Sequence, residues 1–166
     1  MKIRKRRLQL FILLFAVSSL LVQLPSEAFA DSNSSGSVKS IVQINDSTTN
    51  GPVLENNDQF GHSIANIGDL DGDGVIDLVV GASKDDNAAG NKRGTVHILF
   101  MESDGSVKST AVINDSTENG PDLTSGDQFG YSVEHLDDLD RDGVNDLAVG
   151  AINDDEGTGN LSLIHI

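Results

Sequence analysis

The sequence contains no cysteine, and aromatic residues make up only 4% of its 166 residues. Without cysteine there is no disulfide, no cysteine nucleophile and no attachment point for a lipoprotein anchor. No run with helical periodicity occurs after residue 30. Short β-branched stretches instead alternate with turns rich in Asn, Asp and Gly. This pattern predicts an all-β fold.

Basic residues are also scarce once the first 30 residues are set aside. Those residues hold five of the 11 Lys and Arg, so the rest of the chain has 6 basic and 25 acidic residues, a formal net charge of −19. A chain this acidic does not bind nucleic acid or an anionic membrane through its own field. Acidic composition can indicate disorder, but here the carboxylates gather in loops between apolar runs. We therefore expect order that depends on bound cations.

Residues 1–30 have the three parts of a secretory signal peptide. Basic residues lie between Lys2 and Arg7, an apolar run extends from Leu8 to Leu24, and Ala28-Phe29-Ala30 provides the small-x-small cleavage pattern. The alternative is an uncleaved membrane anchor, because the run approaches the length of a spanning helix. We expect cleavage, a polar spacer over residues 31–37, and a secreted or cell-surface protein without membrane insertion.

Two acidic segments of nine residues, 69–77 and 138–146, are the most informative feature. Each has Asp at positions 1, 3, 5 and 9 and Gly at position 6. Closely spaced carboxylates repel one another and need a counter-charge, and Ca2+ accepts about 6–8 oxygen ligands. Glycine at position 6, Gly74 or Gly143, permits a sharp turn with positive φ. The predicted ligands are the carboxylates of Asp69, Asp71, Asp73 and Asp77 with the Val75 carbonyl, and those of Asp138, Asp140, Asp142 and Asp146 with the Val144 carbonyl.

A solvated acidic turn is the simplest alternative for such a segment, because Asp and Gly are common turn residues. Two copies, each followed by an apolar run, make that alternative weaker. An EF-hand fits poorly, because its loop needs Glu at position 12 between two helices. Val80 and Val149 stand there, inside strand-like runs.

The chain is an internal repeat with an offset of 69 residues. Aligning residues 36–91 with 105–160 needs no gap, and 34 of the 56 positions are identical. Repeats of this size point to solenoids, propellers or arrays. About four strands per repeat matches one propeller blade. Strands are predicted near Lys39–Ile44, Phe60–Ile67, Leu78–Ala82, Thr95–Phe100, Lys108–Ile113, Phe129–Leu136 and Leu147–Ala151.

Three elements in fixed order give the chain a family resemblance. Phe60-Gly61, the first acidic loop and Gly81-Ala82-Ser83 resemble an FG-GAP repeat, the blade unit of the integrin α-chain β-propeller. Phe129-Gly130, the second loop and Gly150-Ala151-Ile152 resemble another. Ser83 and Ile152 replace the usual final proline. The resemblance implies β-propeller blades that hold calcium through the loop residues named above.

Two pairs of matched residues are predicted to be structural. Phe60 and Phe129 are expected as core aromatics between strands of neighbouring blades. Gly81 and Gly150 are expected where the backbone bends or is closely approached.

The repeats divide the chain into residues 38–104 and an incomplete second copy, 105–160. This is fewer than two blades, whereas a closed propeller has about four to eight, so we expect a truncated fragment. Leu161 to Ile166 resembles one reading frame of a widely used transposon-based sequencing adapter. We expect these six residues to be an artefact; the alternative is a divergent last strand.

No serine lies in a nucleophile elbow, and neither repeat keeps a histidine at a matched position. We therefore expect no enzyme activity and no catalytic residues. The expected function is an adhesion or ligand-binding scaffold, with further blades and an extracellular protein or glycan as partners. The alternatives are an accessory module of a larger secreted hydrolase and a structural spacer. The candidate contact loops are residues 45–57, 84–93, 114–126 and 153–160.

Overall fold

The computed structural model describes residues 38–86, 92–154 and 160–164. The predicted signal peptide, the polar spacer and the last two residues lie outside these ranges. The chain divides into two units, residues 1–39 and 40–166, and the account below concerns the second. The described residues form strands and turns without any helix. None of them, accordingly, belongs to a helix long and apolar enough to cross a membrane.

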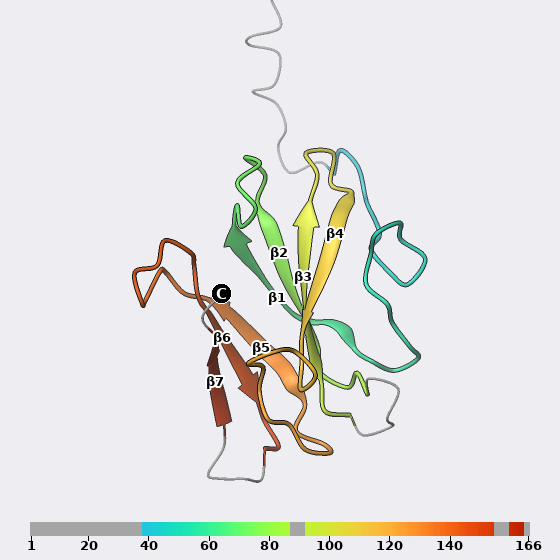
Figure 1. The fold of residues 1–166 in the computed structure, drawn as a ribbon. Helices are drawn as coiled ribbons and strands as arrows, with labels where there is room; N and C mark the ends of the chain where they lie inside the picture. The colour runs from blue at the N-terminus through green and yellow to red at the C-terminus, as the bar shows by residue number, and fades with distance from the viewer. Residues whose placement is uncertain (1–37, 87–91, 155–159, 165–166) are drawn as a thin grey trace, which may run out of the picture. The chain divides into compact units, whose positions relative to one another are not determined.

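The described residues form seven strands, arranged in two antiparallel sheets (Figure 1). The first sheet has the order β1-β2-β3-β4 and the second the order β5-β6-β7. Each strand pairs with the next one along the chain, as in a blade of a β-propeller. The bounds are β1 Phe60–Gly68, β2 Asp77–Ala82, β3 Thr95–Met101, β4 Val107–Ile113, β5 Phe129–His135, β6 Leu147–Ala151 and β7 Asn160–Ile164.

The six predicted strands from residue 60 to residue 151 are therefore confirmed, and the predicted strand at 39–44 is wrong. Residues 39–44 align with β4, which pairs with the preceding strand β3. No strand precedes residues 39–44 within the described part of the chain. Their backbone groups stay outside any ladder, and Ile41 is 80% exposed.

Because of strand β4, the boundary between the two sheets does not coincide with the boundary between the two sequence repeats. It belongs to the first sheet, although its residues follow the predicted repeat boundary at 104/105. Strand β7 includes residues 161–164 and pairs with β6 from Leu147↔Ile164 to Ala151↔Asn160. The β2–β3 pair has the same pattern, from Leu78↔Leu99 to Ala82↔Thr95. The artefactual origin of residues 161–166 stays a prediction, because an alternating apolar segment pairs this way whatever its source.

The main hydrophobic core lies between the two sheets. Strand β5 packs across β1, β2 and β3, and Phe129 at its start is fully buried. The core also includes Ile67, Val79, Val96, Ile98, Ile113, Leu123, Val133, Leu147, Val149 and Ala151. A smaller cluster contains Val80, Leu99, Met101 and Val107, with Phe60 packed against it. The prediction of a core aromatic between blades is thus confirmed for Phe129, whereas Phe60 is only half-buried.

Close backbone approach explains the glycine in β2. A Cβ on Gly81 would lie 2.0 Å from the carbonyl oxygen of Gly130 in β5. The Ser63 hydroxyl of β1 donates a hydrogen bond of 2.8 Å to the same oxygen. At Gly150 an added Cβ would lie 2.4 Å from the hydroxyl of Ser132. Both glycines therefore lie at close approaches, as predicted.

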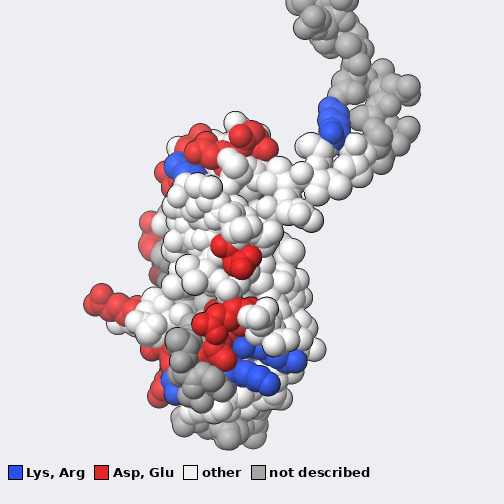
Figure 2. Space-filling view, turned by 90° about the vertical axis from the view of Figure 1, so that its right-hand side faces the viewer, with Lys and Arg blue, Asp and Glu red and all other residues white. Residues whose placement is uncertain are grey.

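Figure 2 shows acidic side chains at several places over one face of the molecule.

Candidate metal centre

Both acidic segments connect neighbouring antiparallel strands. Residues 69–76 join β1 to β2, and the corresponding segment of the second copy joins β5 to β6. The turn conformation follows from the sequence, because Gly74 has φ +89° and Gly143 has φ +97°. Position 4 also has positive φ, at Gly72 in the first loop and Arg141 in the second. The predicted role of glycine at position 6 is confirmed.

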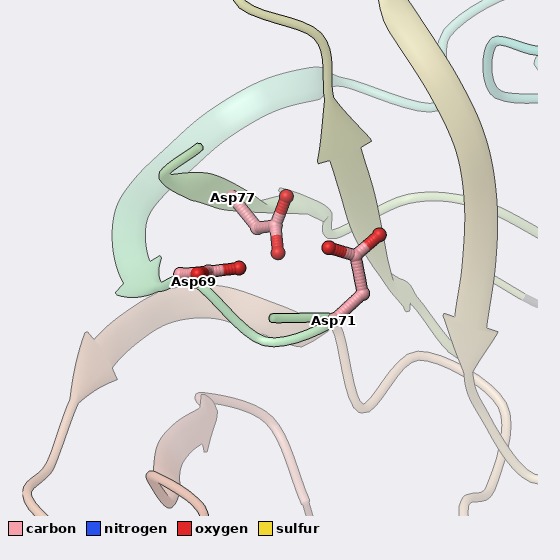
Figure 3. A group of neighbouring side chains, drawn as sticks. All are labelled: Asp69, Asp71 and Asp77. Carbon is pink, nitrogen blue, oxygen red and sulfur yellow. The ribbon is translucent and has the colours of Figure 1, made fainter. Parts of the chain in front are cut away.

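Three carboxylates meet in each loop. In the first loop, oxygen atoms of Asp69, Asp71 and Asp77 all lie within 4.8 Å of one another. Figure 3 shows these three side chains directed toward a common space. In the second loop the same arrangement is made by the matched residues Asp138, Asp140 and Asp146. Positions 1, 3 and 9 of both predicted ligand sets therefore come together.

Backbone amides hold the first-position carboxylate in place. Asp69 accepts hydrogen bonds from the amide of Asp73 at 2.9 Å and from that of Gly74 at 2.8 Å. Asp138 accepts the matched bonds from Asp142 and Gly143 at 3.0 and 2.9 Å. Donors directed at a carboxylate stabilise its charged form. Each loop thus offsets part of the repulsion within its own acidic cluster.

The ninth-position carboxylate anchors the loop to the sheet. Asp77 is fully buried and accepts hydrogen bonds from the amides of Leu70, at 2.8 Å, and Met101, at 2.9 Å. Met101 is the last residue of β3, so Asp77 links the loop to a second strand. Asp146 is equally buried and accepts a bond of 2.8 Å from the Leu139 amide. A buried charge needs such partners.

The fifth-position carboxylate lies outside the three-carboxylate group. Asp73 accepts a hydrogen bond of 2.9 Å from the Val75 amide, and Asp142 accepts one of 2.8 Å from the Val144 amide. The roles of Asp73, Asp142 and the two valine carbonyls as metal ligands stay predictions. Asp73 directly precedes Gly74, and Asp142 directly precedes Gly143, where the chain turns.

A basic residue that sequence reasoning missed contacts the first loop. Lys108 of β4 donates hydrogen bonds from Nζ to Asp71 at 2.7 Å and to Asp73 at 2.6 Å. These contacts raise the pKa of the Lys108 ammonium, and the Lys108 contact also lowers the pKa of Asp73. The sequence did contain a signal for this lysine: the repeated Gly-Ser-Val-Lys-Ser segment has lysine at the same place in both copies.

The two loops are neighbours in space. Asn145, at position 8 of the second loop, donates a hydrogen bond of 3.0 Å from Nδ2 to the carbonyl of Ile67 in β1. A small hollow between the loops is lined by Ile67, Asp69, Leu70, Gly143, Val144 and Asn145. Packing of β5 on the first sheet therefore brings both acidic loops to the same edge.

The chemistry of the donor set fits a hard divalent cation. All candidate ligands are carboxylate or carbonyl oxygens, which Ca2+ and Mg2+ prefer over nitrogen or sulfur. Ca2+ accepts about 6–8 oxygen ligands in variable geometry, whereas Mg2+ demands near-ideal octahedral geometry. Only oxygen donors make up the two groups found among the described residues, so each arrangement can bind a cation.

Comparison with known proteins agrees with this geometry. Residues 60–99 match the model of the FG-GAP repeat. The chain is 35% identical over 95 residues to integrin alpha pat-2 of Caenorhabditis elegans, covering 56% of this chain and 7% of that protein. It is 29% identical over 141 residues to integrin alpha-PS3 of Drosophila melanogaster, covering 82% and 12%. With human integrin alpha-11 the identity is 39% over 97 residues, covering 58% and 8%.

Paired antiparallel sheets with an acidic loop after the first strand of each define a β-propeller type of repeat protein. The matched family and relatives make the assignment specific: the chain is an FG-GAP, integrin-α-like repeat protein. It spans only about a tenth of the length of the curated relatives it matches.

Proposed function

We propose that this chain is a secreted or cell-surface FG-GAP protein that binds Ca2+ in both acidic loops and serves as an adhesion or ligand-binding β-propeller scaffold. The observation that carries the proposal is the meeting of three carboxylates in each of two matched loops. The bound ion would offset the repulsion that remains among the carboxylates of each loop. We propose a binding role for this chain and no enzyme activity of its own.

Calcium binding is tested by titrating the full chain and recording amide spectra by NMR. The Gly74 and Gly143 amides each donate to the first carboxylate of their own loop, so their signals report the two sites separately. Both should shift with Ca2+, with affinity near the extracellular range of about 10⁻⁴–10⁻³ M. Mg2+ should shift them only at higher concentration.

Matched variants assign the binding to the loops. Asp71→Ala should abolish the shift of Gly74 and leave that of Gly143, and Asp140→Ala should do the reverse. A chain in which neither amide responds to Ca2+ would overturn the metal proposal. Equal loss at both loops in either variant would instead indicate a disrupted fold, which the spectrum of the metal-free protein detects.

Export depends on residues 1–30, which lie outside the described residues. We propose that they direct secretion and are removed, as the cleavage pattern at Ala28 to Ala30 predicts. Mass spectrometry of protein collected from the medium should find Asp31 at the mature N-terminus. Retention of residues 1–30 on membrane-bound protein would support the anchor instead.

Further FG-GAP blades are the proposed structural partners. Val133 of β5 is 8% exposed because it packs against the first sheet, whereas its repeat counterpart Ile64 of β1 is 62% exposed. Matched positions of a propeller face the preceding blade in the same way. The face that carries Ile64 is thus suited to another blade of the same kind.

The adhesion function rests on loops held by the sheets, because loops on a rigid scaffold commonly carry recognition. The proposed contact loops are those predicted from the sequence, residues 45–57, 84–93, 114–126 and 153–160, of which 87–91 and 155–159 lie outside the described residues. A pull-down against matrix glycans and surface proteins, with and without chelator, tests this function. Capture that needs calcium supports a binding scaffold, and no capture in either condition supports a spacer.

A further inference from the structure

Lys108 lies where a cation in the first loop would compete with it. Its ammonium contacts Asp71 Oδ2 at 2.7 Å and Asp73 Oδ2 at 2.6 Å. Asp71 is one of the three converging carboxylates, and Asp73 is the fourth carboxylate of the same loop. The Lys108 side chain is 38% exposed, and the two carboxylates are about a quarter exposed. The contact is therefore at the edge of the cluster, in reach of water.

The lysine changes the charge that the loop presents. Four carboxylates stand in the first loop, and Lys108 contributes one positive charge from β4. In the metal-free loop this charge reduces the repulsion among the carboxylates. When a divalent cation binds, the same charge repels it. Lys108 therefore stabilises the metal-free loop and destabilises the metal-bound loop.

We propose that Lys108 is a tethered counter-ion of the first loop, which orders the metal-free loop and lowers the affinity of that loop for Ca2+. The inference rests on the proposed calcium binding. Both hydrogen bonds of Lys108 go to the first loop, so the effect is largest at that site. Lys108 thereby adjusts the Ca2+ affinity of the first loop, although it is not itself a metal ligand.

The topology makes this a cross-repeat contact. Lys108 belongs to the second copy of the sequence repeat, within Gly105-Ser106-Val107-Lys108-Ser109. Strand β4 nevertheless completes the first sheet, so the lysine of one sequence repeat contacts the acidic loop of the copy before it.

The test compares Lys108→Met with Lys108→Arg in the full chain. Methionine keeps an apolar stem without the charge, and arginine keeps the charge. At low salt, Lys108→Met should raise Ca2+ affinity at the first loop by roughly tenfold, read from the Gly74 amide, and added salt should shrink the difference. Lys108→Arg should stay within about threefold of the natural protein. The affinity of the second loop, read from Gly143, should change much less than that of the first loop in either variant.

A second measurement needs no metal. In the metal-free protein, Lys108→Met should speed hydrogen exchange at the Gly74 and Val75 amides, which bond to loop carboxylates. Exchange at Gly143 should not change.

Unchanged or lowered affinity at the first loop of Lys108→Met, with Ca2+ still bound at both loops, would overturn the role of Lys108 alone. Absence of Ca2+ binding at both loops of the natural protein would instead overturn the proposed function. Unchanged exchange at Gly74 and Val75 would also contradict the ordering role of Lys108.

Discussion

Asn145 in the second acidic loop is hydrogen-bonded to the Ile67 carbonyl, two residues before the first loop begins. The bond joins the two sheets at the edge where both acidic clusters lie. Ile67 is nearly completely buried, so its carbonyl is costly to leave without a partner. The two loops are therefore linked through the backbone of β1.

Asn145→Ala should lower the free energy of unfolding by about 1–2 kcal/mol, because the Ile67 carbonyl loses its side-chain donor. Ile76→Ala is the matched control at the same position of the first loop, where the side chain is 59% exposed; it should change stability by less than about 0.5 kcal/mol. Urea denaturation of both variants measures the difference. Equal effects in the two variants would contradict a link through Asn145.

Replacing Val133 should lower the free energy of unfolding much more than replacing its repeat counterpart Ile64. Val133→Ala opens a cavity in the core between the sheets and should cost about 2 kcal/mol. Ile64→Ala removes an exposed side chain and should cost less than about 0.5 kcal/mol. Thermal or urea unfolding checks this. A large loss for Ile64→Ala would show that this face is covered in solution by something other than the described chain.

Gly81→Ala should separate the two sheets. Its new methyl group would meet the Gly130 carbonyl, a backbone atom that cannot move without shifting β5, and the loss should be about 3 kcal/mol. Gly150→Ala is the control, because its methyl meets the hydroxyl of Ser132, a side-chain atom. We expect the control to cost at least 1 kcal/mol less. The amide spectrum of β5 should change in the first variant.

Asp58 gives the stability a pH dependence of known sign. Burial is the main cause that raises the pKa of this carboxyl above its ordinary value of 3.8, with Asp85 and Asp86 adding to it. The folded protein therefore holds this proton more tightly than the unfolded chain does. The favourable contribution of Asp58 to the free energy of unfolding is complete below pH 3.8. It is lost as the pH rises through the pKa that Asp58 has in the folded protein.

Asp58→Asn should remove this dependence, since the amide oxygen can still accept from the Glu55 amide, which bonds to Asp58 at 2.5 Å. Relative to the natural protein, the variant should gain stability as the pH rises above the ordinary carboxyl pKa of 3.8. Urea denaturation across pH 4–7 in metal-free buffer measures the difference. Parallel curves for the two proteins would count against a buried, protonatable Asp58.

The amino-acid sequence by itself determined the strands and the acidic loops. Alternating and β-branched runs from Phe60 to Ala151 specify strands locally, because side chains of period two match one buried face. The spacing of Asp69, Asp71 and Asp77 brings their carboxylates together through a nine-residue turn, which needs only local geometry and glycine at position 6. All of this information lies within about ten residues of chain.

Pairing partners and cross-strand contacts were decided by tertiary structure. Residues 39–44 have a strand-like sequence similar to that of β4, yet among the described residues only β4 follows a strand with which it can pair. The contacts of Lys108 with Asp71 and of Asn145 with Ile67 span 37 and 78 residues. Such contacts depend on which sheet each strand enters and on how β5 packs against β1. Spacing along a sequence has no information about distances that arise only when separate strands pair and pack.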